Sequence, residues 1–170
     1  YNTSLNGGLG GWNNINPSRC LPTAEIYILG DGTNATETLT TQNVWYIFNN
    51  ATNFVANPSG TSVFSSPSNC ALKYTGASGK YFHTAVSISS SSSNAARNYQ
   101  IALFRNSVLE PGTIFSVDYA SNNIITSSAF HKVMQLNTND TIEVKIRDIS
   151  GGGTIITYNN INFVAMACCN

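Results

Sequence analysis

The chain has 170 residues, which suits one domain with a sizeable core, and 8 basic residues balance 8 acidic ones. Only 9% of the residues are charged, against about 25% in an ordinary soluble domain, and 60 residues are Asn, Ser or Thr. This composition excludes the basic stripe of a nucleic-acid-binding protein and the basic patch of a protein drawn to anionic membranes. No apolar run reaches the roughly 18 residues of a membrane span, so membrane insertion is not expected either.

The first 22 residues are rich in Gly and Asn and show no sustained periodicity. We interpret residues 1–22 as an N-terminal arm or linker, in which large apolar groups such as Leu9 and Trp12 are available for docking. No signal-peptide pattern is present and the chain begins at Tyr1, so we expect a processed amino end or further chain upstream.

From residue 23 onward, short alternating segments bounded by Gly, Asn and Ser predict β-strands, and no ten-residue helical pattern interrupts them. Residues 23–170 are therefore expected to form a single all-β domain, an antiparallel sandwich of about 8 to 10 strands with less than about 10% helix. The residues after 48 are interpreted as a polar loop that runs through 58–60, the serine run 89–93 as a flexible connection, and residues 151–153 as a hairpin tip. The expected strands are 21–29, 44–48, 71–74, 81–89, 99–105, 113–119, 124–135, 142–146, 154–158 and 162–167.

Strict period-two alternation predicts which side chains form the core. Residues 142–146 alternate between apolar and charged side chains, the pattern of a half-buried antiparallel strand. Because alternate residues of a strand share one face, the apolar positions of several strands should meet between two sheets. The predicted core residues are Phe82, Val86, Ile88, Ile101, Leu103, Leu136, Ile142, Val144 and Ile146.

Four cysteines occur, at Cys20, Cys70, Cys168 and Cys169. They have no C-x-x-C spacing and no histidine lies at zinc-finger spacing, so no zinc site is expected. Two interpretations stay open: buried free thiols that act as small apolar groups, or a disulfide between Cys20 and either Cys168 or Cys169.

Four segments carry a resemblance to a known superfamily. Residues 79–86 contain a glycine followed by two aromatic residues, residues 99–106 an apolar strand closed by Arg-Asn, residues 133–144 a Leu-to-Asp step into an alternating strand, and residues 162–166 a closing strand with a central Phe. In order and spacing these resemble the jelly rolls of the complement-globular-head and tumour-necrosis-factor superfamily. The Ser- and Asn-rich texture resembles the versions found in viral and phage capsid decorations and fibre heads.

The resemblance implies a jelly roll that forms tight threefold trimers. The strands that match those at the threefold axis would place Tyr81, His83, Ala85 and Phe163 in the trimer contact. Three copies of His83 would then meet, and the trimer would weaken as the pH falls below about 6, where histidine side chains take up a proton.

The chain holds few groups for acid–base chemistry, with two histidines and eight carboxylates in all. No G-x-S-x-G elbow is present, and Glu143 shares a strand face with Lys145 and Arg147 that we interpret as solvated. His83 is interpreted as an interface histidine and His131 as a surface residue. We therefore expect no enzyme activity, no catalytic residues and no cofactor. The carboxylates weighed for a glycosidase-type pair are Glu25, Glu110, Asp118 and Glu143.

Asp140 follows Asn137-Thr138-Asn139 and is interpreted as a turn residue that satisfies backbone N–H groups. Calcium would need converging oxygen ligands, for which Asp31 and Asp148 are the other candidates, and no metal site is expected. Sequons begin at Asn2, Asn34, Asn50 and Asn139, and they have meaning only if a eukaryotic cell secretes the chain.

The sequence thus favours a non-enzymatic virion surface protein, either a capsid decoration or a fibre head, that mediates host attachment or particle coating. The expected partners are copies of itself, other capsid or fibre proteins through the N-terminal arm, and a host glycan or protein receptor. Two further readings are a secreted recognition or adhesin domain and a carbohydrate-binding module, in which Trp12, Trp45 or tyrosines would stack on sugar rings.

Overall fold

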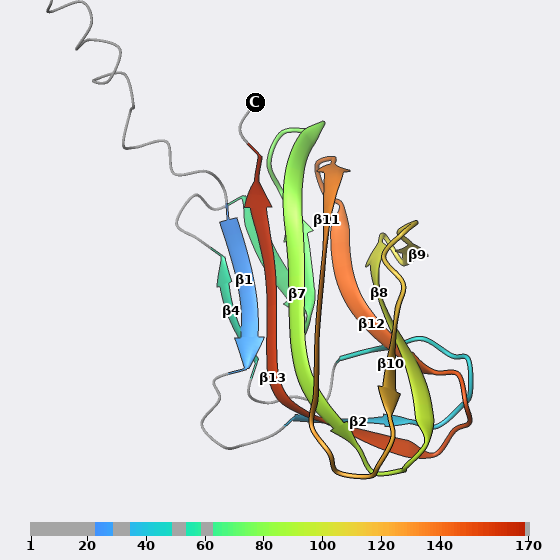
Figure 1. The fold of residues 1–170 in the computed structure, drawn as a ribbon. Coiled ribbons are helices and arrows are strands. Elements are labelled where there is room, and N and C mark those ends of the chain that lie inside the picture. Colours follow the sequence, from blue (N-terminus) through green and yellow to red (C-terminus); the bar gives the residue numbers. More distant parts are fainter. Residues whose placement is uncertain (1–22, 29–34, 49–53, 59–62, 169–170) are drawn as a thin grey trace, which may run out of the picture.

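The computed structural model describes residues 23–28, 35–48, 54–58 and 63–168. These ranges contain strands and no helix, as the alternating sequence predicts, and so no helix that could cross a membrane. Figure 1 shows the strands as two facing layers. The strands are β1 (Thr23–Ile28), β2 (Ala35–Leu39), β3 (Tyr46–Ile47), β4 (Phe54–Pro58), β5 (Phe64–Ser68), β6 (Ala71–Tyr74), β7 (Lys80–Ser92), β8 (Arg97–Arg105), β9 (Val108–Leu109), β10 (Phe115–Tyr119), β11 (Thr126–Leu136), β12 (Thr141–Asp148) and β13 (Thr154–Ala167).

The strand order identifies a jelly roll. One sheet, here the first sheet, runs β11-β7-β13-β1-β4 with β2 also paired to β13; the second sheet runs β10-β8-β12-β6-β5, with β3 and β9 added beside β12 and β8. Every pairing is antiparallel. Consecutive strands such as β6 and β7, or β12 and β13, lie in opposite sheets, so the chain wraps back and forth across the sandwich as in other double-sheet jelly rolls (Figure 1). The expected all-β jelly-roll fold is confirmed.

The core lies between the two sheets and contains all nine residues predicted from the alternation. Each of the nine is at most 2% exposed, and the strands that carry them show the expected alternation of buried and more exposed positions. Aromatic residues fill the space at the two ends of the core. At one end Phe82 packs edge to face with both Phe64 and Tyr74, whose own rings are tilted to each other, and Phe48 packs on Tyr158.

The prediction of a flexible connection at the serine run is wrong. Strand β7 continues through Ser92, and the side chains of Ser90, Ser91 and Ser92 are buried. Ser90 Oγ lies 2.5 Å from the hydroxyl of Tyr119, and Ser92 Oγ lies 2.8 Å from that of Tyr99. Serine is small enough to fit beneath these rings and supplies the hydroxyl partner that a buried tyrosine needs, so the run belongs to the core.

Other boundaries also differ from the prediction. The strand expected at 44–48 shrinks to Tyr46–Ile47, and the two strands expected at 154–158 and 162–167 form the continuous strand β13. Its register against β7 shifts between Tyr158 and Asn160, so an extra residue is accommodated without ending the strand. Strands β2, β4, β5 and β9 had no counterpart in the prediction, because segments this short give no sustained alternating pattern.

Candidate interaction surface

The first sheet turns one face to the core and the other away from it. We call the second of these the outer face. Antiparallel pairing places Val133 of β11 opposite His83 of β7, and His83 opposite Met166 of β13, so side chains from three strands form continuous rows across it. The outer face consists of Ser127, Ala129, His131, Val133, Gln135, Tyr81, His83, Ala85, Ser87, Ser89, Asn160, Asn162, Val164, Met166, Thr23, Glu25 and Tyr27.

The outer face is apolar at one end and polar at the other. Tyr81, Val133 and Met166 are 45%, 54% and 43% exposed, although they are large apolar side chains on three neighbouring strands. Toward the other end the rows contain serines and asparagines; for example, Ser89 Oγ lies 2.7 Å from Ser127 Oγ, and Asn162 Nδ2 donates to Glu25 Oε1 at 2.5 Å. An exposed apolar patch with a polar border is typical of an interaction site.

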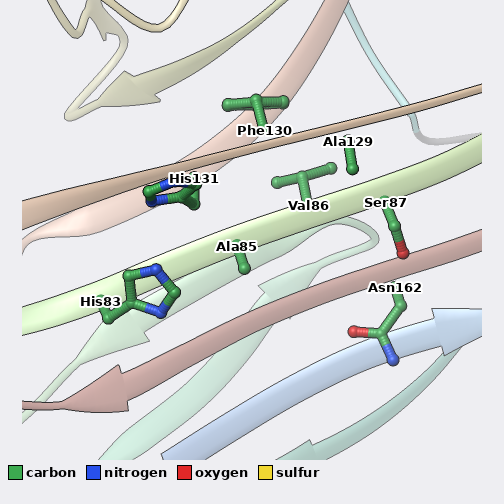
Figure 2. A pocket seen from close by; sticks show the side chains of 8 residues that line it. All are labelled: His83, Ala85, Val86, Ser87, Ala129, Phe130, His131 and Asn162. Carbon is green, nitrogen blue, oxygen red and sulfur yellow. The ribbon is translucent and has the colours of Figure 1, made fainter.

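A shallow hollow of about 290 Å³ lies in the middle of the outer face. Figure 2 shows the small side chain of Ala85 between His83 and Ser87 along β7, and that of Ala129 near Phe130 on the neighbouring strand β11. Phe130 also contributes to the hollow, and its ring packs 4.6 Å from that of Phe115 on the opposite sheet, which supports this edge of the sandwich. The hollow is lined by His83, Ala85, Val86, Ser87, Ala129, Phe130, His131 and Asn162.

The two histidines of the chain lie side by side at this hollow. His131 pairs with Ala85 and His83 pairs with Val133, so the two histidines are diagonal neighbours on adjacent strands. Their ring centres are 5.1 Å apart with an angle of 50° between the ring planes. The sequence predicted an interface histidine and an unrelated surface histidine, and missed their proximity because only the pairing of β7 with β11 brings them together.

The residues predicted for the trimer contact divide between two environments. Tyr81, His83 and Ala85 lie on the outer face, where a partner could touch them. Phe163 is fully buried in the core of the single chain, opposite Val86, so its assignment to the contact face is wrong. Phe163 pairs with an inward-facing residue of β7 and must therefore also face inward.

The charged face of β12 differs from the predicted solvated surface. The side chains of Glu143 and Lys145 are each only 16% exposed and form an ion pair at 3.1 Å. Lys145 Nζ lies 4.7 Å from the centre of the Phe104 ring, and the Arg147 guanidinium lies 4.6 Å from that of Trp45. These cations lie against aromatic rings. The strand therefore alternates between apolar and charged residues although few of its charges are exposed to water.

The carboxylates considered as metal ligands serve turns. Asp140 accepts hydrogen bonds from the Asn137 N–H at 2.8 Å and from Asn106 Nδ2 at 2.7 Å, as its interpretation as a turn residue requires. Asp148 is fully buried and accepts from the N–H groups of Ser150 and Gly151. Asp31 lies outside the described residues. Within the described ranges no group of three or more His, Cys, Asp or Glu side chains converges.

Two of the four cysteines, Cys70 and Cys168, lie within the described residues. Among the described residues both are unpaired, and burial raises the pKa of Cys70 well above its ordinary value. Cys20 and Cys169 lie outside the described residues, as do the N-terminal arm and Trp12, so a disulfide between Cys20 and either Cys168 or Cys169 stays a prediction.

Comparisons with known proteins find likeness of fold only. No protein-family model and no curated protein sequence matches the chain. The globular domain of zebrafish complement 1qA is 12% identical with a TM-score of 0.47, covering 88% of this chain and 99% of that one. The PRD1 vertex protein P5 is 10% identical with a TM-score of 0.49, covering 86% and 97%. The Eiger TNF from S. frugiperda is 9% identical with a TM-score of 0.48, covering 88% and 95%. The jelly-roll assignment rests on the strand order of this chain.

Proposed function

We propose that this chain is a non-enzymatic surface domain of a virus or phage particle, a capsid decoration or fibre head, that assembles as a homotrimer through the apolar end of its outer face. The observation that carries the proposal is the row Val133–His83–Met166 with Tyr81 beside it. A monomer would leave these large side chains in water, whereas contact between copies would bury them. Ala85, in the next row, lets another sheet approach closely.

The surface composition supports a structural or recognition role outside the cell. With 60 residues of Asn, Ser and Thr and only 9% charged residues, the chain has a polar surface that does not depend on charge. Several of its charged groups are used within the fold. Glu110 forms ion pairs with Arg105 at 3.3 Å and with Lys132 at 3.5 Å, and Asp148 satisfies a turn. These carboxylates are therefore engaged in holding strands and turns together, which favours a non-enzymatic domain.

A carbohydrate-binding module has less support than a domain that recognises or binds protein. The ring of Trp45 is partly buried, with Phe104 at 5.1 Å between ring centres and the Arg147 guanidinium over it. A sugar that stacked on this ring would have to displace the arginine.

A secreted recognition or adhesin domain would use the same outer face, so it differs from a virion protein in location. Recovery of the chain from purified particles supports the virion assignment. Recovery only from secretions supports the secreted domain and refutes the virion assignment.

Light scattering of the purified chain tests the assembly. At micromolar concentration the expected mass is three times the 18.2 kDa of one chain. Val133→Asp places a charge at the apolar end and should yield a folded monomer, whereas Ser127→Asp, on the same strand at the polar end, should leave the trimer intact. Circular dichroism of both variants checks that the fold is kept. A wild-type monomer would refute the trimer.

A further inference from the structure

We propose that His83 and His131 form a binding site for one divalent transition-metal ion of the kind that prefers imidazole ligands. Both ligands come from a single chain, so the site does not depend on the proposed trimer. It goes beyond a surface or coating role, because it assigns a specific ligand chemistry to the hollow in the outer face.

The spacing of the two rings suits a shared metal ion. A zinc-type ion lies about 2.0–2.1 Å from an imidazole nitrogen and binds its ligands near the tetrahedral angle, which places the centres of two ligating rings about 5 Å apart. The observed separation of the ring centres is 5.1 Å. Figure 2 shows both rings on the same side of the sheet, beside one another on neighbouring strands.

The backbone holds the two side chains in this arrangement. β7 and β11 pair over eleven consecutive positions without a register shift, from Thr126 opposite Ser90 to Leu136 opposite Lys80. Both histidines occupy outward positions near the middle of this ladder, and the diagonal between them is within reach of aromatic side chains. A site on two long paired strands is more precisely positioned than one on loops.

The surroundings leave the imidazoles available to a metal ion. Among the described residues, no side-chain hydrogen bond or ion pair engages either ring. The nearest cation in sequence, Lys132, points to the other side of its strand, where it donates to the carbonyl of Pro111 and pairs with Glu110. In the single chain, Ala85 and Ala129 leave open space beside the rings for water molecules to complete the coordination.

The ligand set predicts which ions bind. Imidazole nitrogen suits Cu²⁺, Ni²⁺, Co²⁺ and Zn²⁺, whereas Ca²⁺ and Mg²⁺ require oxygen ligands, which this pair does not provide. Nickel should therefore bind more tightly than cobalt, and copper more tightly than nickel. The expectation of no metal site followed from sequence spacing, which cannot detect two ligands joined by strand pairing.

Isothermal titration of the full chain with Ni²⁺ near neutral pH tests the site. We expect one ion for each chain, and a loss of affinity of about tenfold or more in either His83→Asn or His131→Asn. Ser87→Ala, a change in the same hollow that removes no imidazole, should bind as the wild type does. Amide resonances of β7 and β11 should broaden first on addition of paramagnetic Ni²⁺.

Three results would overturn the inference. These are unchanged affinity in both histidine variants, competition by Ca²⁺, or thiolate-to-cobalt charge-transfer absorption on adding Co²⁺, which would place the ion on cysteines. The mass measured by light scattering separates this proposal from the trimer. A monomer that binds one ion supports the metal site and refutes the trimer. A trimer that binds no ion supports the trimer and refutes the metal site.

Discussion

Ser90 Oγ lies 2.5 Å from the hydroxyl of Tyr119 in the buried interior, and this contact joins the first sheet to the second. Two residues further along β7, Ser92 Oγ makes the same kind of contact, 2.8 Å from the hydroxyl of Tyr99. The rings of Tyr99 and Tyr119 meet edge to face with 5.1 Å between their centres. One end of the sandwich is thus held together by paired hydroxyls as well as by apolar packing.

Replacement of Ser90 by alanine should lower the stability of the protein more than the small change in size suggests. Ser90→Ala leaves the buried hydroxyl of Tyr119 without its partner, which should lower the free energy of unfolding by about 1–3 kcal/mol. Ser89→Ala, on the outer face of the same strand, should change it by less than about 0.5 kcal/mol. Urea denaturation measures both. Equal effects would show that the Ser90–Tyr119 contact does not stabilise the core.

Tyr158 should respond in the opposite way to Tyr119. The Tyr158 hydroxyl is buried and has no hydrogen-bond partner among the described residues. Tyr158→Phe removes that unsatisfied group, so stability should stay the same or rise by up to about 1 kcal/mol. Tyr119→Phe breaks a formed hydrogen bond and should lower stability by about 0.5–1.5 kcal/mol. A thermal melt that ranks the two variants the other way would contradict this account.

Alkaline pH should unfold the protein through its tyrosines. Burial is the largest cause that raises the pKa of Tyr99 and Tyr119, and it raises the pKa of Tyr158 well above the usual 10.0. The unfolded chain therefore loses these protons first, near pH 10, and the folded chain keeps them. Stability should be fully present below about pH 10 and fall as the pH rises beyond it. Urea midpoints measured across this range test the decline, which should be shallower in Tyr158→Phe.

Leu103 tests the core that the alternation predicts. It is fully buried on β8, and β8 lies between β10 and β12 in the middle of the second sheet. Leu103→Ala should lower the free energy of unfolding by about 2–5 kcal/mol, because it removes packing and leaves a cavity. Val108→Ala is the control, since Val108 is 69% exposed. A change within a few tenths of a kcal/mol for Leu103→Ala would disprove the core assignment.

The sequence predicted best where strands are long and one face is buried. On β7 and β12 the alternation identifies the buried side chains, because a register slip of one residue would expose every apolar side chain to water. It predicted less well where polarity and burial disagree. The serine run looks like a linker until its hydroxyls are placed against Tyr99 and Tyr119, and the charges of β12 look solvated until Trp45 and Phe104 are found beneath them.

The sequence by itself determined the fold class and nine residues of the core, since both follow from local period-two patterns that any antiparallel sandwich must satisfy. Only the tertiary structure decided which way Phe163 faces, because its direction depends on the register between β13 and β7. Only the tertiary structure likewise placed His83 next to His131. Their proximity depends on strand pairing between distant segments, and local residue patterns do not specify which strands become neighbours.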